Sequence, residues 1–305
     1  KATGTVQALG GLGSAVTVDF SGNSATDGTH GNVRTYTAGD VTIQATGAES
    51  DSDLLIQGSQ VQAGQTVRLQ AQGDIALKAA ANTYSDASSH SSKGASVGMS
   101  FSAQGVSANA SASRAKGQGN GQGTAYSNTE VGGRSVAIES GADTTLQGAV
   151  VSGEQVRAQV GGDLRIHSLQ DTDQYHESSR SVGMGISAPI AGPGQASASL
   201  NLGRTRIDSS FRSVDEQSAI RAGDGGFQVD VGGNTSLQGG QITSSEAAVQ
   251  QGKNRFTTGG DLLLSDLTNQ ADYKASGSSV GMAVGGSAPG QSPGAGLSGA
   301  GMGSD

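Results

Sequence analysis

The chain repeats one tetrapeptide three times at long intervals. Ser-Val-Gly-Met begins at Ser96, Ser181 and Ser279, and each copy follows an apolar stretch introduced by Gly-Asp. A repeat of this length indicates that the chain stacks copies of one structural unit, so the unit carries both the fold and the function. A unique active site is not expected in such a tandem array.

Further repeated pairs set the period at about 90 residues. A Gln-Gly pair follows a Leu or Ile at Gln57, Gln147 and Gln238, with separations of 90 and 91 residues. The Gly-Asp pairs are 89 and then 98 residues apart, so we expect a short insertion in the third copy, between Ser244 and Phe256. We divide the chain into the end of a truncated repeat and three full repeats, at residues 1–20, 21–112, 113–203 and 204–305.

Composition and patterning favour a stack of short strands. The 305 residues include 51 Gly, 3% aromatic residues and no Trp or Cys. Segments such as 66–71 alternate small apolar residues with polar ones, and Gly recurs every few residues at the expected turns. At about 20 residues per rung, this pattern predicts an all-β fold, a right-handed parallel β-helix (β-solenoid) with β-hairpin excursions, one per repeat.

The Ser-Val-Gly-Met segments themselves predict the hairpins. In residues 95–112, apolar residues alternate with Gly, Ser or Asn on both sides of Gln104-Gly105, which is typical of a β-hairpin with strands of about nine residues. Residues 16–20 resemble the return strand of a fourth, truncated copy. The candidate membrane or partner residues are Val97, Met99, Phe101, Val182, Met184, Ile186, Val280, Met282 and Val284.

Two interpretations of these hairpins remain open. Strands with one apolar and one small, polar face have the pattern of outer-membrane strands, so the hairpins could insert into, or pair within, an outer membrane. The alternative, which we expect for the chain in solution, is that each hairpin folds back over the flank of the solenoid. Exposed apolar strand edges favour that second arrangement because they invite aggregation.

Charge and motif content argue against other functional classes. The net charge is −8 and the pI about 4.9, without a basic cluster in the sequence, so we expect no nucleic-acid partner. We also expect no enzyme activity, no cofactor and no small-molecule substrate, because the charged residues are scattered. No run of 18 apolar residues predicts a transmembrane helix.

Three minor motifs support only weak alternatives. The four His residues, at 30, 90, 167 and 176, lack metal-ligand spacing, so we expect no metal site. Residues 223–226 give only a fragment of a calcium-binding repeat. Residues 117–121 partly mimic a phosphate-binding loop but lie in a polar, Gly/Ser-rich lead-in, 113–130, and are predicted to be a flexible linker.

The ordered anchors resemble a known family. Residues 56–64 and 67–75, ending in Gly73-Asp74-Ile75, are similar to the haemagglutinin repeats of two-partner secretion exoproteins. Those exoproteins include the filamentous haemagglutinin adhesins and the contact-dependent growth inhibition effectors of Gram-negative bacteria. With its Ser-Val-Gly-Met hairpin, the unit is most similar to the second, more C-terminal repeat block of the inhibition effectors.

This resemblance implies a secreted, cell-surface filament segment of a Gram-negative bacterium, exported by an outer-membrane transporter partner. It implies that the segment helps to present or translocate a C-terminal toxin across the outer membrane of a target cell, with that membrane or a surface receptor as partner. The alternative is the stalk of a haemagglutinin-like adhesin that binds host cells; a polysaccharide lyase is a third class. Because Lys1 lies mid-pattern, we expect a piece of a longer chain.

Overall fold

The computed structural model describes residues 5–9, 15–20, 24–27, 34–37, 39–46, 50, 52–102, 105–192, 194–286 and 294–304. The chain forms two compact units that alternate along the sequence. The first, called here the solenoid unit, comprises Lys1–Thr83, Thr124–Asp171 and Arg212–Asn269. The second, called the hairpin unit, comprises Tyr84–Gly123, Thr172–Phe211 and Gln270–Asp305.

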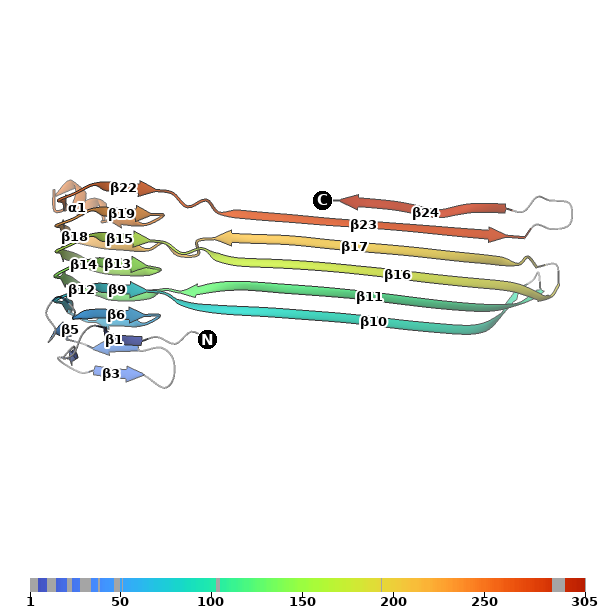
Figure 1. The fold of residues 1–305 in the computed structure, drawn as a ribbon, viewed down its shortest axis with the longest axis horizontal. Coiled ribbons are helices and arrows are strands. Elements are labelled where there is room, and N and C mark those ends of the chain that lie inside the picture. Colours follow the sequence, from blue (N-terminus) through green and yellow to red (C-terminus); the bar gives the residue numbers. More distant parts are fainter. Residues whose placement is uncertain are drawn as a thin grey trace. The chain divides into compact units, whose positions relative to one another are not determined.

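The described residues form three sheets (Figure 1). In spatial order, the first solenoid sheet contains β1 (Thr5–Leu9), β6 (Asp53–Gln57), β9 (Ile75–Lys78), β13 (Thr144–Gln147), β15 (Leu164–His167), β19 (Thr235–Gln238) and β22 (Leu262–Ser265). The main path of the second contains β2 (Ala15–Phe20), β5 (Val41–Thr46), β8 (Thr66–Ala71), β12 (Thr129–Ser140), β14 (Ala149–Val160), β18 (Ala219–Val231) and β20 (Gln241–Thr243). Beside it lie β3 (Ser24–Asp27), β4 (Arg34–Thr37), β7 (Gln60–Ala63) and β21 (Arg255–Thr258). The third sheet contains β10 (Ala80–Ser102), β11 (Gly105–Ser127), β16 (Asp171–Ala191), β17 (Ser197–Ser213), β23 (Gln270–Gly285) and β24 (Gly294–Ser304).

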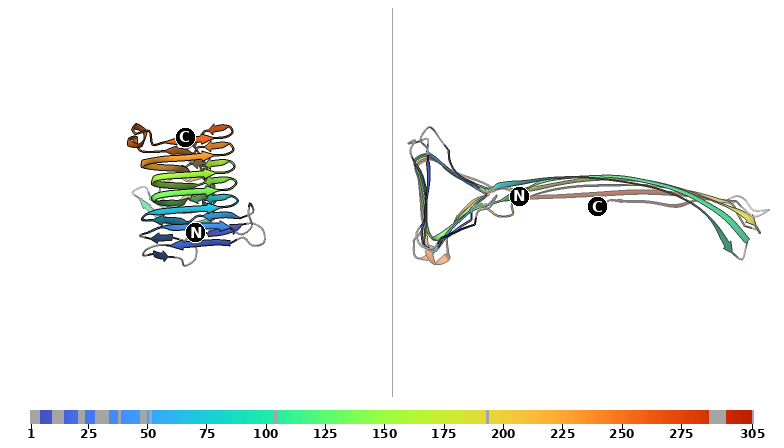
Figure 2. Two further views of the ribbon diagram at one scale, coloured as in Figure 1. Left: turned by 90° about the vertical axis from the view of Figure 1, so that its left-hand side faces the viewer. Right: turned by 90° about the horizontal axis from the view of Figure 1, so that it is seen from below.

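From β5 and β6 onward, the rungs of the solenoid unit stack in parallel. The pairs Leu54↔Ile75, Ile75↔Thr144, Thr144↔Leu164, Leu164↔Thr235 and Thr235↔Leu262 are 21, 69, 20, 71 and 27 residues apart. Short separations, of 20–27 residues, therefore alternate with long ones, of 69 and 71 residues. A rung followed by a short separation is called here a short rung, and one followed by a long separation a long rung. Each long separation contains one segment of the hairpin unit. Figure 2 shows the stacked rungs and, viewed along the stack, their triangular outline. The predicted all-β parallel β-helix with hairpin excursions is confirmed, while its handedness stays a prediction.

Small apolar side chains fill the interior of the solenoid. Along β5, Val41, Ile43 and Ala45 are buried while the residues between them are half-exposed, as strand alternation requires. The largest fully buried side chains are Leu54, Ile56, Leu69, Ile75, Leu77, Ile138, Leu146, Leu164, Ile166, Ile220, Val41 and Val61. Full burial of one such side chain contributes about 1.5–3 kcal/mol. The narrow core therefore needs almost no aromatic residues.

One corner of the solenoid is held by a ladder of Asp and Asn side chains. The backbone N–H of Asp74 donates to Asp53 Oδ1 at 2.7 Å, and the same bond recurs on each following rung. The further donor and acceptor pairs, at 2.7–2.8 Å, are Asp143 to Asp74, Asp163 to Asp143, Asn234 to Asp163 and Asp261 to Asn234. The Gly-Asp pairs that end in Asp74, Asp163 and Asp261 thus belong to this ladder between rungs, which the sequence alone does not reveal.

Arg165 bridges two neighbouring carboxylates of this ladder. Its guanidinium contacts Asp143 Oδ2 at 2.6 Å and Asp163 Oδ2 at 2.7 Å. Partial burial opposes ionisation of Asp143, but the N–H of Asp163 and the Arg165 guanidinium together lower the pKa of Asp143 below its ordinary value of 3.8. A bridging cation thus offsets the repulsion that stacked carboxylates would otherwise create.

In every short rung, a glycine forms the corner that directly follows the strand of the first sheet (β6, β13 or β19). Gly58, Gly148 and Gly239, the glycines of the repeated Gln-Gly pairs, have φ between 54° and 63°. L-residues rarely adopt this region, and a Cβ at Gly58 would also overlap Ala80. In the long rungs, Lys78 and His167 pair with Gln147 at this corner, and there the chain leaves for a hairpin.

Two local features extend the sequence prediction. The expected insertion in the third repeat contains the short helix α1 (Glu246–Gln250), whose N-cap Ser245 accepts a hydrogen bond from Ala248 N–H at 3.2 Å. At the N-terminal end, β1 and β2 pair antiparallel with β6 and β5. Residues 16–20 therefore lie in a solenoid sheet and not in the hairpin sheet, contrary to the expectation of a truncated hairpin. The proposed repeat boundaries stay a prediction.

The ladder predicts a specific loss of stability on truncation of Asp143. We expect Asp143→Ala to lower the free energy of unfolding by about 1–3 kcal/mol, because Asp163 N–H loses its charged acceptor. Asp143→Asn should lose less, since the amide oxygen can accept the same bond, as Asn234 does two rungs further on. Urea unfolding followed by circular dichroism measures both; equal losses in the two variants would contradict the role of the acceptor.

Asp143 also predicts an acid-sensitive contribution to stability. Its folded-state pKa lies below the unfolded value, so its contribution is complete above the unfolded pKa and disappears as pH falls through the folded pKa. We expect the melting temperature to fall below about pH 4. Asp143→Asn should flatten this part of the pH profile, whereas an unchanged slope would show that other groups account for it.

Candidate functional site

The hairpin unit is a single antiparallel sheet with long strands. β23 and β24 pair antiparallel, from Ser276↔Ser304 to Gly285↔Gly294. The spatial order β10, β11, β16, β17, β23, β24 follows the chain, so each hairpin lies beside the next one in the sequence (Figure 1). The sheet therefore brings together the three Ser-Val-Gly-Met segments, which are far apart in the sequence.

All nine candidate residues of the hairpins are exposed. They lie on β10, β16 and β23, and their exposure ranges from 39% for Val280 to 88% for Val97. Ile190 and Leu202 are also exposed large apolar side chains, at 61% and 42%. Ile190 was not among the candidates, although the alternation from Met184 through Ile186 and Ala188 continues to it.

Hydrogen bonds between side chains show which residues share a face of this sheet. Ser96 Oγ contacts Ser111 Oγ at 2.8 Å, which puts the even residues of β10 with the odd residues of β11. Further bonds join even residues of β11, β16, β17 and β23 to one another: Gln122 with Gln174, His176 with Asp208, and Ser210 with Asp272.

Strand alternation then gathers the apolar residues around the repeated motif on one face. This face, called here the apolar face, carries Val97, Met99, Phe101, Val182, Met184, Ile186, Ile190, Leu202, Val280, Met282 and Val284. The opposite face carries mainly Ser, Gly and Asn around the repeated motif. Within the hairpin unit the sheet is a single layer, so the sheet itself does not cover this face. Folding back over the solenoid flank stays a prediction.

The strands are much longer than the sequence predicted. β10 and β11 contain 23 residues each, against about nine expected. The predicted lead-in 113–130 and flexible linker 117–121 are wrong, because β11 continues to Ser127. Extended backbone persists there because every second residue from Gly117 to Gly123 is a glycine facing a large or polar neighbour.

The glycines of β11 accommodate these neighbours sterically. A Cβ at Gly117 would overlap the ring of His90, and one at Gly123 would overlap the ring of Tyr84. Aromatic or heterocyclic side chains that cover glycines on an adjacent strand are a known way to stabilise Gly-rich strands. The period-two Gly alternation was the sequence signal that could have identified this strand.

Hydroxyl groups close the solenoid across the base of each completed hairpin. Thr129, which follows the first hairpin, is fully buried and donates to Lys78 C=O, which precedes it, at 2.6 Å. Ser59 N–H donates to the same hydroxyl at 3.4 Å. After the second hairpin, Ser218 Oγ donates to His167 C=O at 2.7 Å and accepts from Gly148 N–H at 2.9 Å. We call Thr129 and Ser218 the hydroxyl clasp.

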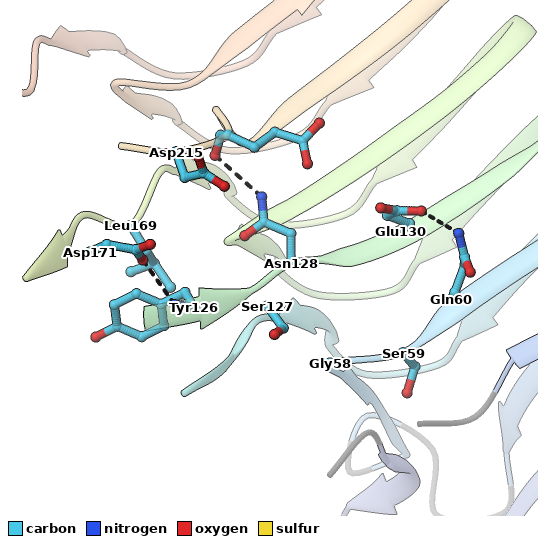
Figure 3. A pocket seen from close by; sticks show the side chains of 11 residues that line it. Gly58, Ser59, Gln60, Tyr126, Ser127, Asn128, Glu130, Leu169, Asp171 and Asp215 are labelled. Carbon is cyan, nitrogen blue, oxygen red and sulfur yellow. Dashed lines mark hydrogen bonds between the residues drawn. The ribbon is translucent and has the colours of Figure 1, made fainter. Parts of the chain in front are cut away.

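A polar pocket of about 350 Å³ lies at this corner of the solenoid unit (Figure 3). Asn128 Nδ2 donates to Glu216 C=O at 3.2 Å, and Tyr126 N–H donates to Asp171 Oδ1 at 2.8 Å. Gln60 Nε2 donates to Glu130 Oε2. Several of the polar groups lining the pocket are thus bonded to one another, an arrangement that ties the segments following the two hairpins to neighbouring rungs.

The minor motifs occupy structural positions. Residues 223–226 form an irregularity of β18, where the pairing shifts between Gly153 and Gln155 and Gly226 has a φ of 72°. Of the four His residues, His30 lies outside the described residues, while His176 Nδ1 contacts Asp208 Oδ1 at 2.5 Å. Together with Arg206, this contact lowers the pKa of Asp208. The described residues contain no cluster of three metal-ligating side chains.

Among the described residues, no helix is both long and apolar enough to span a membrane.

The clasp predicts a stability loss from removal of one hydroxyl. Thr129→Val keeps the side-chain shape but leaves Ser59 N–H without this acceptor and removes the bond to Lys78 C=O. We expect about 1–3 kcal/mol lower stability and faster hydrogen exchange at Ser59. Thr129→Ser, which keeps the hydroxyl, is the matched control. Equal stability of the Val and Ser variants would refute the clasp.

Comparisons with known proteins place these features in one family. A family model described as hemagglutinin repeat matches residues 17–182, more than half of the chain. Curated relatives include Toxin CdiA of Escherichia coli, 40% identical over 82% of this chain and 8% of the relative. Deoxyribonuclease CdiA of Yersinia pseudotuberculosis is 38% identical over 82% of this chain and 23% of the relative. tRNA nuclease CdiA of Yersinia mollaretii is 36% identical over 80% of this chain and 8% of the relative.

The chain therefore spans less than a quarter of the length of these three curated relatives. No solved structure matches it. The nuclease activities are named for the whole relatives, whereas the family match is to a repeat, which is a structural unit.

Proposed function

This chain belongs to the hemagglutinin-repeat family, and we propose that it is a structural segment of a secreted contact-dependent growth inhibition effector. In this proposal, the segment helps to present or translocate a C-terminal toxin across the outer membrane of the target cell. The similarity to proteins named toxin and nuclease CdiA over most of the chain supports the toxin class. It favours this class over the alternative of an adhesin stalk.

The observation that carries the proposal is the exposed apolar face of the hairpin sheet. Soluble proteins rarely expose a contiguous row of large apolar side chains, and such a row indicates a membrane or protein partner. The solenoid does not need this face for its own closure, because the clasp completes the rungs across the hairpin bases. Membrane contact is therefore assigned to the hairpin unit, and the solenoid unit acts as the rigid filament.

The proposal includes the route by which the segment reaches its target. We expect export by an outer-membrane transporter partner and display on the surface of a Gram-negative cell. A stack of parallel rungs suits this route, because each rung can form on the preceding one as the chain emerges. The partner on the recipient is its outer membrane or a surface receptor within it.

The apolar face can be tested in the full-length effector. Met99→Asp, Met184→Asp and Met282→Asp together place three charges on that face. We expect a large loss of target-cell growth inhibition, because a charge on a lipid-facing strand position costs about 1–2 kcal/mol or more. The matched control places Asp on the opposite face of the same strands, at Ser100, Ser181 and Ser279.

Surface display and the circular dichroism of the isolated 305-residue chain establish that both triple variants are exported and folded. Unchanged toxin delivery by the Met variant, with the solenoid intact, would reject a membrane role for the apolar face. Equal loss in both triple variants would show that added charge, and not the apolar face, disturbs delivery.

A further inference from the structure

Basic side chains border the apolar face on the hairpin sheet. Lys93 on β10 precedes Val97 by four residues, and Arg180 on β16 precedes Val182 by two. Both spacings are even, so each cation shares a face with its apolar neighbour. Arg114 and Lys116 on β11 and Arg204 on β17 lie on the same face by the same alternation. We call these five residues the basic band: Lys93, Arg114, Lys116, Arg180 and Arg204.

The basic band is accessible and carries uncompensated charge. All five side chains are exposed, and none of them forms an ion pair among the residues that the structure describes. Lys116 and Arg180, from adjacent strands, line one shallow hollow together with Ser91 and Ser178. Hydroxyl and cationic donors that converge in this way suit a phosphate oxygen.

Acidic residues of the sheet are placed away from this band. Asp86, Asp173 and Glu177 alternate to the opposite face, where Glu177 Oε2 accepts a hydrogen bond from the Tyr175 hydroxyl at 2.8 Å. On the shared face, Asp208 is bonded to Arg206 and His176, and Asp272 accepts hydrogen bonds from Ser210 and Gln270. The sheet therefore has a cationic side although the whole chain has a net charge of −8.

The dimensions of the apolar face fit one leaflet of a bilayer. The apolar segment of β10, from Val97 to Phe101, spans four residue steps, about 13 Å at 3.3 Å per residue, and Lys93 lies four residues before Val97. Half of the hydrocarbon core of a bilayer is about 15 Å thick. If Phe101 enters the hydrocarbon, Lys93 and its neighbours lie near the head groups, where long basic side chains are most favourable.

We propose that the basic band binds the phosphate groups of an anionic lipid surface while the adjoining apolar face enters the outer part of that bilayer. This inference rests on the proposed function and specifies the chemistry of its membrane partner. An anionic lipid can contact both surfaces, because its phosphate binds the basic band and its acyl chains cover the apolar face. A free phosphate would leave the apolar face uncovered. A second copy of the chain would cover that face but would place cations near cations.

Flotation of the purified 305-residue chain with vesicles tests the proposal without toxin or target cells. We expect binding to vesicles of phosphatidylcholine mixed with phosphatidylglycerol, weaker binding to phosphatidylcholine alone, and loss of the difference at high salt. Arg180→Gln with Arg204→Gln should weaken binding to the anionic vesicles about 25-fold, roughly fivefold for each removed charge. Inorganic phosphate at millimolar concentration should not compete.

The matched control is Arg134→Gln with Arg157→Gln, which removes the same charge from exposed positions of the solenoid unit. The control should bind anionic vesicles as the unchanged chain does, and circular dichroism verifies that both double variants are folded. Equal weakening in both variants would overturn the basic band, and so would equal binding to neutral and anionic vesicles.

Two other outcomes also overturn the proposal. Competition by inorganic phosphate would indicate a free-anion site, and a dimer in sedimentation that binds no vesicles would assign the apolar face to a second copy. A further combination of results separates the two proposals. If the Met variant fails to deliver toxin but the unchanged chain binds no vesicles, the lipid partner is rejected. The proposed function then stays supported, with a protein receptor as the partner. The two proposals therefore fail separately.

Discussion

The solenoid depends on hydrogen bonds that hold each rung in register with the next. Within the sheets the backbone supplies them, but at the corners the strands separate and the backbone groups need other partners. At one corner, a side-chain oxygen of Asp or Asn accepts the N–H of the following rung, from Asp53 to Asp261. At another, a left-handed glycine such as Gly148 brings its N–H to the carbonyl of the next rung, at His167.

This corner chemistry explains how the fold accepts long excursions. A short rung closes with glycine, while a long rung leaves at Lys78 or His167 and returns at Thr129 or Ser218. The returning hydroxyl bonds the carbonyl where the chain departed, so the rung is closed almost as if no hairpin were present. The excursion can then vary in sequence at little cost to the solenoid, which leaves the hairpins available for a functional surface.

The hairpin sheet divides its two faces by chemistry. One face carries the apolar side chains of the repeated motif next to basic ones. The other carries Ser, Gly and Asn around the motif, carboxylates such as Asp173, and the aromatic residues Tyr84, Tyr175 and Phe211. Burial cannot explain the apolar residues, because Val97 and Phe101 are among the most exposed side chains of the structure. A role at a surface outside the chain is the simplest physical reason for their presence, and it agrees with a family whose relatives are named as toxins.

The sequence by itself determined the repeat, the strand pattern of the rungs and the alternation of the hairpins, because period and alternation are local properties of the chain. It also placed the insertion that contains α1 (Glu246–Gln250). The sequence did not predict the strand at Gly117–Gly123. The rings that fill the space beside these glycines come from residues far away in the sequence, such as His90 and Tyr84. Only the tertiary structure decided the Asp ladder, the clasp and the basic band, since each depends on which residues lie side by side once the rungs and hairpins are aligned.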